Sequence, residues 1–395
     1  MSRTRELIFS AALVAFGLVL SLALLEVAVR FTHLIPDRFW EPDKLLGSKL
    51  IPGQRGWWTQ EEREFVVPVQ INREGLRDVE HAYEKPPNVY RILLLGDSFV
   101  EAMHVPLEAT LGRQLELRLN AMVGGRRIEV IAAGVSSYGT AGELLYFRRD
   151  GKRYHPDLVL LAFYPGNDVK NNSPTLEDYL KPEYSADGEI QRISEPKKSA
   201  PAHGWRGLLA RSKAYQLIRQ ILLVRQPRLG QWLIHAGLMK ADAVHEAPQR
   251  GGIPADYGVY DSAVNDEWQD AWQRTFRLFD ELQREAAGVG AQLGVLILST
   301  RDQVYPDSWK QIVAANPAMQ SVQWDLDAPQ RRTEEWCTRQ AVPCTALGPE
   351  FVRAAQSGGE ALHFMHDGHW TPPGHALAGR LVAEFVSRHF IHSKE

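Results

Sequence analysis

Short apolar runs alternate with segments of helical periodicity from residue 89 to the end of the chain. YRILLLG, IEVIAAG, DLVLLAF and QLGVLIL each predict a buried strand, and VPCTAL predicts a shorter one. Between them, leucine recurs every four residues in 107–123, and four aromatic residues share one face of a helix in 266–287. Strands that are apolar at nearly every position and alternate with helices predict a parallel central sheet covered on both faces. We therefore expect a three-layer α/β/α sandwich.

The N-terminus has a different pattern, because no charged residue stands between Leu7 and Leu25. At about 1.5 Å per residue this stretch just crosses the hydrocarbon of a bilayer. A cleaved signal peptide is the alternative, but its apolar region is normally shorter and ends in a small-x-small site, whereas LEVAVRF follows here. We expect an uncleaved single-pass anchor in residues 1–30. Basic residues flank the span on both sides, so the positive-inside rule leaves its orientation open.

The rest of the chain divides into a membrane-proximal segment, 31–88, and an α/β domain, 89–395. An insertion at 171–260 interrupts that domain, and insertions of this kind commonly form lids or substrate walls. Its segment WRGLLARSKAYQLIRQILLV predicts an amphipathic helix in which arginines accompany many leucines. Two interpretations stay open for this helix: packing on the domain, or contact with a membrane surface.

Composition excludes some classes of function. A formal net charge of −3 over 395 residues gives no bulk attraction to nucleic acid, and we expect no such partner. The chain has two cysteines, Cys337 and Cys344, which fit either a helix–strand disulfide or two buried thiols. A disulfide would favour a periplasmic or extracellular domain, since cytosolic thiols stay reduced.

Small or polar residues follow three predicted strands in succession: Ser98, Gly134 and Asn167. Ligands of open parallel sheets bind at the carboxyl ends of the strands, so these residues belong to one edge. A serine is a weak nucleophile without a base, and HFMHDGHWTPPGH supplies Asp367 and His369 near the C-terminus. A carboxylate beside an imidazole fixes its tautomer and stabilises the imidazolium. We expect Ser98 as nucleophile, His369 as base and Asp367 as the orienting acid.

The same segment allows a metal site, since His363, His366, His369 and His375 lie close together in the sequence and imidazole suits zinc. No cysteine lies nearby, no HExxH motif is present, and a metal would leave Ser98 without a role. We therefore expect neither a metal nor another cofactor.

Four segments in order, GDSF at 96–99, AGVSSYGT at 133–140, YPGNDV at 164–169 and DGHW at 367–370, resemble the sequence blocks of the SGNH, or GDSL-type, hydrolase superfamily. The resemblance implies a flavodoxin-like α/β fold and a serine esterase that forms an acyl-Ser98 intermediate. It also implies an oxyanion hole made by the backbone N–H groups of Ser98 and Gly134 and by the Asn167 amide.

The last block reads Asp-x-His followed by Trp and Thr-Pro, where many family members have Asp-x-x-His. This variant is similar to membrane-anchored carbohydrate O-acyl esterases and to alginate-acetylation-like proteins. It implies cleavage of O-acyl esters, O-acetyl above all, on a carbohydrate, a cell-envelope glycan or a small ester. The implied location is the bacterial inner membrane, with the catalytic domain in the periplasm or outside the cell.

Two other functions fit the same residues. An O-acyltransferase of extracellular polysaccharide modification would use the same triad, with polysaccharide-assembly proteins as partners. A non-catalytic assembly subunit could keep the fold, but the intact Ser98, Asn167, Asp367 and His369 argue against it.

Overall fold

The computed structural model describes residues 3–60, 62–176, 182–184, 190–193, 209, 211–235, 249–250 and 252–391. The chain forms two compact units. The N-terminal unit comprises Met1–Asp37, Trp57–Val66 and Lys197–Val244, and the α/β unit comprises Arg38–Gly56, Val67–Pro196 and His245–Glu395. This division crosses the expected boundaries, because segment 31–88 contributes to both units and the middle of the insertion belongs with the N-terminal helix.

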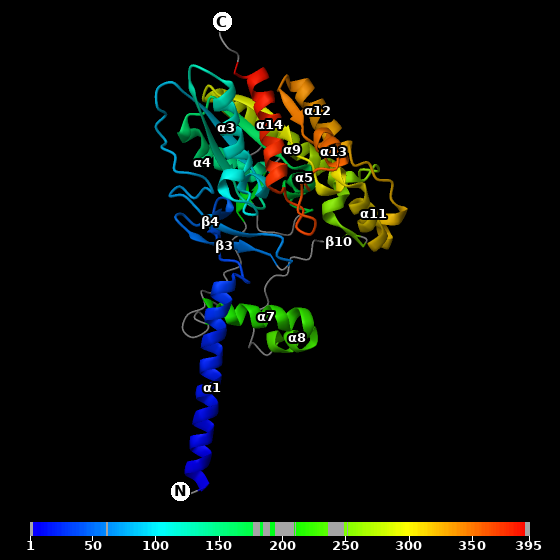
Figure 1. Cartoon of the computed structure of the whole chain (residues 1–395). Helices are drawn as coiled ribbons and strands as arrows, with labels where there is room; N and C mark the ends of the chain where they lie inside the picture. Colours follow the sequence, from blue (N-terminus) through cyan, green and yellow to red (C-terminus); the bar gives the residue numbers. More distant parts are fainter. Residues whose placement is uncertain are drawn as a thin grey trace. The chain divides into compact units, whose positions relative to one another are not determined.

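A five-stranded parallel sheet forms the centre of the α/β unit (Figure 1), with strand order β13–β12–β7–β5–β6. The strands are β5 Val89–Gly96, β6 Arg127–Gly134, β7 Leu158–Phe163, β12 Gln292–Ile297 and β13 Cys344–Ala346. All six residues of β7 are buried, as expected for an interior strand covered on both faces. The predicted three-layer α/β architecture is confirmed.

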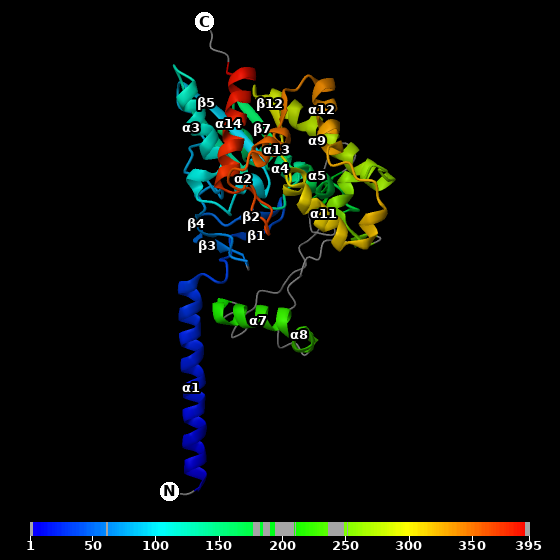
Figure 2. The same ribbon diagram turned by 45° about the vertical axis from the view of Figure 1, so that its right-hand side comes forward.

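Helices cover both faces of the sheet (Figure 2). One face packs against α4 Thr140–Arg149, α9 Asp266–Gly288 and α12 Ala328–Gln340. The other packs against α2 Ser98–Glu101, α3 Leu111–Met122, α13 Gly348–Gln356 and α14 Pro372–His389. Along β5, Leu93 and Leu95 belong to the first layer, and Ile92 and Leu94 to the second, which is the alternation that a pleated strand imposes.

Shorter elements complete the chain. The predicted leucine-spaced helix at 107–123 begins later, because Thr110 caps α3 after a 3₁₀ turn. The remaining helices of the α/β unit are α5 Pro165–Asn171, α10 Arg301–Val304, α11 Pro306–Ala315 and the 3₁₀ helices η1 Leu107–Ala109, η2 Gly151–Tyr154, η3 Ala255–Tyr260 and η4 Pro317–Ser321. The antiparallel strand pairs are β1 Trp40–Asp43 with β2 Gly47–Leu50, β3 Arg55–Thr59 with β4 Val66–Gln70, β8 Pro182–Tyr184 with β9 Ile190–Ile193, and β10 Gln249–Arg250 with β11 Ile253–Pro254.

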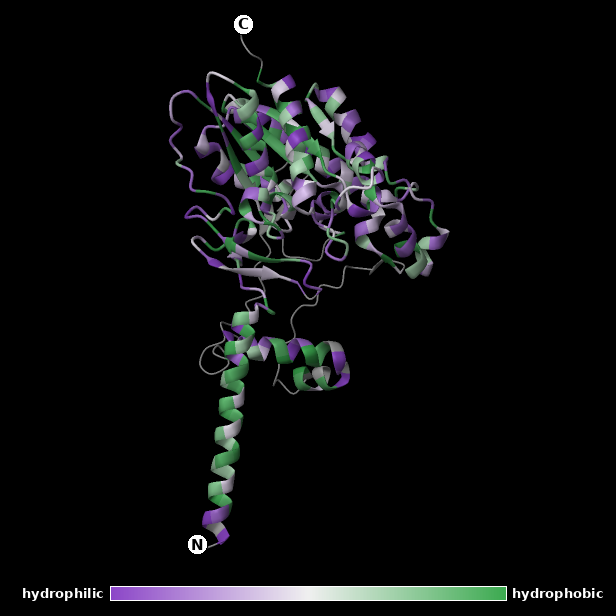
Figure 3. Ribbon diagram, viewed as in Figure 1, coloured by the Kyte–Doolittle hydropathy of each residue, from purple (hydrophilic) through white to green (hydrophobic). Residues whose placement is uncertain are grey.

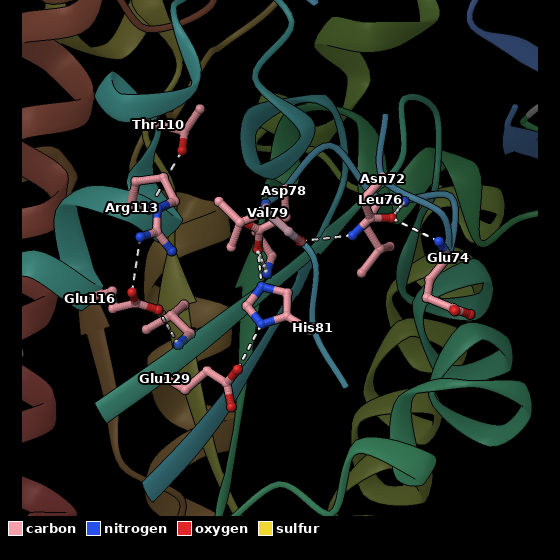
Figure 4. Close-up of polar contacts among 12 residues, drawn as sticks. Asn72, Glu74, Leu76, Asp78, Val79, His81, Thr110, Arg113, Glu116 and Glu129 are labelled. Carbon is pink, nitrogen blue, oxygen red and sulfur yellow. Dashed lines mark hydrogen bonds and ion pairs between the residues drawn. The ribbon is translucent and has the colours of Figure 1, made fainter. Parts of the chain in front are cut away.

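The outer edge of β6 is closed by side chains instead of another strand (Figure 4). The N–H groups of Val130 and Ala132 donate to carboxylates of Glu116 and Asp78, each at 2.8 Å. Pairing these N–H groups removes the unsatisfied donors that an edge strand otherwise presents.

A buried histidine joins this edge to the segment before β5. His81 lies between Asp78 and Glu129, with Nε2 3.2 Å from the first carboxylate and Nδ1 2.9 Å from the second. Glu129 also accepts a hydrogen bond from the buried guanidinium of Arg91 at 2.8 Å. Burial alone would lower the pKa of His81, but the two carboxylates raise it to about 9. The imidazole is therefore charged at neutral pH.

In the N-terminal unit, α1 spans Arg3–Thr32, α7 spans Lys213–Arg225 and α8 spans Pro227–His235. Residues Arg5–Thr32 are long and apolar enough to cross a membrane, a test that a signal sequence also passes. Figure 3 shows this helix as hydrophobic along most of its length. The predicted amphipathic helix is described from Lys213 onward, and its expected start at 205–208 lies outside the described residues.

Candidate active site

Two segments at the carboxyl edge of the sheet bring the predicted catalytic residues together. Ser98 begins α2 directly after β5, and Asp97 caps that helix by accepting the Phe99 N–H at 2.9 Å. Asp367 and His369 lie in the loop before α14. The glycine between them has a φ of +89°, a conformation that a residue with a side chain rarely adopts.

Ser98, His369 and Asp367 form a continuous chain of hydrogen bonds. Ser98 Oγ lies 2.7 Å from His369 Nε2, and His369 Nδ1 lies 2.6 Å from Asp367 Oδ1. The His369 backbone N–H donates to the same carboxylate at 3.1 Å. Burial would raise the pKa of Asp367, but its contact with His369 lowers it to about 2, so the carboxyl is ionised. This is the geometry of a serine nucleophile, a base and an acid that orients the base.

A second imidazole, which sequence reasoning missed, stacks on the first. The rings of His104 and His369 are 3.9 Å apart between centroids and 15° from parallel. His104 Nε2 lies 3.6 Å from Asp367 Oδ1, the oxygen that His369 already contacts. Burial lowers the pKa of His104 well below its usual value, so this ring is neutral. The only signal in the sequence was a histidine six residues after the nucleophile, which no pattern marks as part of a site.

The residues that could bind a metal in the structure differ from those expected from the sequence. The four histidines of 363–375 are not gathered; within the described residues, the donor group that could hold an ion is His104, Asp367 and His369, with ligand atoms within 4.8 Å of one another. Imidazole binds metals through lone pairs in the ring plane, and two nearly parallel stacked rings do not aim these at one point. The residues therefore fit a proton relay better than a metal.

Asn167 is held against the nucleophile turn from α5. Its side-chain Nδ2 donates to Asp97 Oδ2 at 3.0 Å, which fixes the amide beside the start of α2. Asp97 is fully buried, and burial raises its pKa. Glu143 of α4 is also fully buried, and burial and the nearby Asp97 charge raise its pKa well above the usual value. Asp97 and Glu143 are thus two buried acids that interact with each other, and only Asp97 lies in one of the sequence motifs.

The structure gives Gly134 a packing role. It ends β6, where a Cβ would clash with the backbone of Val100 and Glu101 in α2. Only glycine permits this close approach of strand and helix. The neighbouring Val135 N–H donates to Gly96 O at 3.2 Å, which continues the pairing of β6 with β5. Donation of the Gly134 N–H to an oxyanion stays a prediction.

A cavity of about 840 Å³ borders the catalytic loop. Its wall includes Tyr257, Arg301, Tyr305 and His366. The Arg301 guanidinium donates to the backbone oxygen of Met365, which ties the wall to the loop, and His366 directly precedes Asp367. The volume is in the range of roughly 300–1,000 Å³ that small-molecule sites occupy.

Comparisons with known proteins gave weak structural likenesses. No family model and no curated protein matches the sequence. An α/β hydrolase from the metagenome of Lake Arreo, Spain, matches with a TM-score of 0.39 and 12% identity, over 77% of this chain and 97% of that one. A GDSL-like lipase from Bacteroides thetaiotaomicron matches with a TM-score of 0.34 and 12% identity, over 78% and 92%.

A two-domain esterase active on acetylated mannans matches with a TM-score of 0.39 and 9% identity, over 78% of this chain and 51% of that one. Because these TM-scores are low, we draw no inference about function from them. Fold and site together define a parallel α/β protein with a hydrogen-bonded Ser–His–Asp triad at the carboxyl edge of its sheet.

Proposed function

We propose that this protein is a serine esterase. The observation that carries the proposal is the unbroken hydrogen-bond chain from Ser98 through His369 to Asp367. Ser98 Oγ attacks an ester carbonyl while His369 Nε2 takes its proton, and Asp367 stabilises the imidazolium. The imidazolium then protonates the leaving alcohol, which leaves an acyl-Ser98 ester. Water, deprotonated by His369, releases the acid and restores the serine.

The tetrahedral intermediate carries a negative oxygen that needs fixed donors. We assign this role to the N–H of Ser98, the Asn167 amide and the N–H of Gly134. The Asn167 side chain supports this assignment, because the Asp97 contact uses one N–H of its amide and fixes its place. An amide has two such donors, so the second is available to the substrate.

The proposed substrate is an O-acyl ester, in particular an O-acetyl ester, on a carbohydrate or cell-envelope glycan. The cavity supports a ligand larger than the acyl group, because it lies beside the catalytic loop and offers aromatic and polar side chains together. Tyrosine rings pack against apolar sugar faces, while charged and amide groups bind hydroxyls. An O-acyltransferase is the alternative, because a sugar hydroxyl held close to acyl-Ser98 would compete with water for the acyl group.

We further propose that α1 is retained as a membrane anchor of the bacterial inner membrane, with the α/β unit in the periplasm or outside the cell. The end of α1 is part of the N-terminal unit: Val29 is buried, and Glu26 accepts hydrogen bonds from the first turn of α7. Cleavage of α1 as a signal peptide would remove these contacts. Polysaccharide-assembly proteins are the proposed partners.

The esterase and the transferase are separated by following the acyl group. The purified full-length protein in detergent is incubated with an aryl acetate and rising concentrations of an oligosaccharide acceptor. Free acetate and acetylated sugar are then measured by mass spectrometry. Free acetate should dominate even at high acceptor concentration. Dominant acetylated sugar would replace hydrolysis by transfer, and no release of either product would reject both enzymes.

A further inference from the structure

The first turn of α7 is fixed to the point where α1 becomes polar. The Glu26 carboxylate accepts hydrogen bonds from Ser212 Oγ at 2.7 Å and from the Ala214 N–H at 2.9 Å. It also accepts the Lys213 N–H at 3.2 Å, so it pairs donors that a helix N-terminus leaves free. Leu25 ends the uncharged stretch, and Glu26 follows it directly. The start of α7 is therefore held at the level where α1 would leave the hydrocarbon of a membrane.

Helix α7 runs across the axis of α1 and not along it (Figures 1 and 2). A second set of contacts fixes this crossing. Lys213 Nζ donates to the backbone oxygen of Pro36 at 2.6 Å and pairs with Asp37 at 2.9 Å, both just after α1. Arg30 of α1 pairs with Glu26 at 2.7 Å. If α1 spans a bilayer, α7 lies roughly in the plane of its surface.

Large apolar side chains of α7 and α8 are partly exposed. Ile221 is 49% exposed and lies one turn after the exposed Ile218. On α8, Trp232 is 61% exposed and lies one turn after the exposed Leu229. Each pair has i, i+3 spacing and so occupies one face of its helix. Tryptophan is enriched at the boundary between lipid and water, where its ring is partly in each.

The charges of α7 and α8 also fit a position at the boundary between lipid and water. Residues 213–235 contain four basic residues and no acidic one. Arg225 and Arg228, at the junction of the two helices, are both exposed. Basic helices with one apolar face bind bilayers by burying that face between headgroups while the cations contact anionic lipids.

We propose that α7 and α8 form an interfacial hairpin that lies in the headgroup region of the membrane, with Ile218, Ile221, Leu229 and Trp232 inserted. The proposal rests on the membrane anchor proposed above. The exposed apolar face of the hairpin contacts an anionic bilayer surface and not another protein. The hairpin gives the N-terminal unit a second attachment, so the unit cannot swivel freely about a single helix.

The test measures the depth of labelled side chains in the full-length protein. Cys337→Ser and Cys344→Ser provide a background without thiols. Ile221→Cys or Trp232→Cys is then labelled with the environment-sensitive fluorophore NBD. The matched control is Leu117→Cys on α3, since this leucine is 66% exposed but belongs to the α/β unit. Each protein is reconstituted in vesicles of phosphatidylethanolamine and phosphatidylglycerol, and retained aryl acetate hydrolysis shows that it is folded.

Nitroxide-labelled lipid should quench the labels at 221 and 232 several times more strongly than the label at 117, and aqueous iodide should show the reverse order. Quenching at 221 and 232 by iodide alone would overturn the proposal, because the face would then be in water. Protection from both quenchers would also overturn it, because protein would then cover the face. Resistance to alkaline carbonate extraction is measured in parallel, so that failure of the anchor is distinguished from failure of the hairpin.

Discussion

At the scale of single residues, two stacked imidazoles share one carboxylate. In the proposed mechanism His369 becomes a cation when it takes the proton of Ser98, and the neutral His104 ring is stacked on it with 3.9 Å between ring centroids. The carboxylate of Asp367 is contacted by both rings. We therefore expect His104 to act as a positioning residue that keeps the His369 ring in place between Ser98 and Asp367.

His104→Ala should lower kcat with little change in KM, because the variant loses the ring that packs on His369. Aromatic pairs contribute about 0.5–1.5 kcal/mol, which corresponds to a loss of roughly 2- to 12-fold in rate. His104→Phe keeps a ring and should stay within about twofold of the unchanged protein, by the same reasoning. Steady-state kinetics on an aryl acetate decide this. Equal losses in both variants would reject the stacking role.

Asn167→Ala removes one of the three assigned oxyanion donors. Deleting one such donor typically lowers kcat by about 10²–10³-fold, so the effect should be large but short of complete loss. The Asp97 side chain would also lose its partner, which circular dichroism and thermal unfolding would reveal separately. An unchanged kcat would remove Asn167 from the site.

Sequence reasoning placed Ser98, His369 and Asp367 in one site because each lies in a recognisable motif. It had no means of placing His104, whose role depends on a stacking contact with a residue far away in the chain. Gly134 was assigned from its motif as a donor, whereas its packing against α2 follows only from three-dimensional contacts.

At the scale of elements, the buried ion pairs of His81 connect the segment before β5 to the edge of β6. The pKa of His81 is raised from its usual 6.5 to about 9 in the folded protein. A histidine whose pKa is raised by folding contributes its full stabilisation at a pH below 6.5, the pKa in the unfolded chain. This stabilisation is lost as the pH rises through 9, the pKa in the folded protein. The midpoint temperature of thermal unfolding should therefore decrease as the pH is raised from 6.5 to 9.5.

His81→Gln is the control, since it keeps a polar side chain but cannot titrate. Its unfolding midpoint should start lower at pH 6.5 and change less on the way to pH 9.5. Parallel curves for the two proteins over this range would contradict the assignment of the alkaline loss to His81.

The central strands could be predicted because buried parallel strands read as continuous apolar runs. The strands β1, β2 and β3 and the helix α10 could not, because each has only four or five residues, too few to show a period. The short helix α10 nevertheless matters, since it forms one wall of the cavity beside the catalytic loop together with α11.

At the scale of the whole molecule, the division into two units follows from contacts distant in sequence. The Glu26 carboxylate accepts hydrogen bonds from residues nearly two hundred positions later in the chain, and no local sequence pattern reveals such a pairing. Sequence reasoning identified the apolar span and the amphipathic helix separately and left their relation open.

The oxidation state of the two cysteines indicates which compartment contains the α/β unit. Cys337 and Cys344 are thiols in the structure, and the hydrogen bond between them, together with burial, raises the pKa of Cys337. Two thiols in contact should oxidise to a disulfide in a periplasmic or extracellular protein. Non-reduced peptides from freshly isolated protein should show this bond by mass spectrometry. Two alkylatable thiols would remove this support for export.

The central claim is that Ser98 is an acylated nucleophile, and one variant tests it most directly. Full-length protein and Ser98→Ala are compared for hydrolysis of an aryl acetate and for covalent labelling by a fluorophosphonate, with thermal unfolding as the control for folding. The unchanged protein should hydrolyse the ester and gain one label on Ser98. Ser98→Ala should lose both while its unfolding midpoint stays close to that of the unchanged protein. Full activity in a folded Ser98→Ala protein would contradict the serine mechanism.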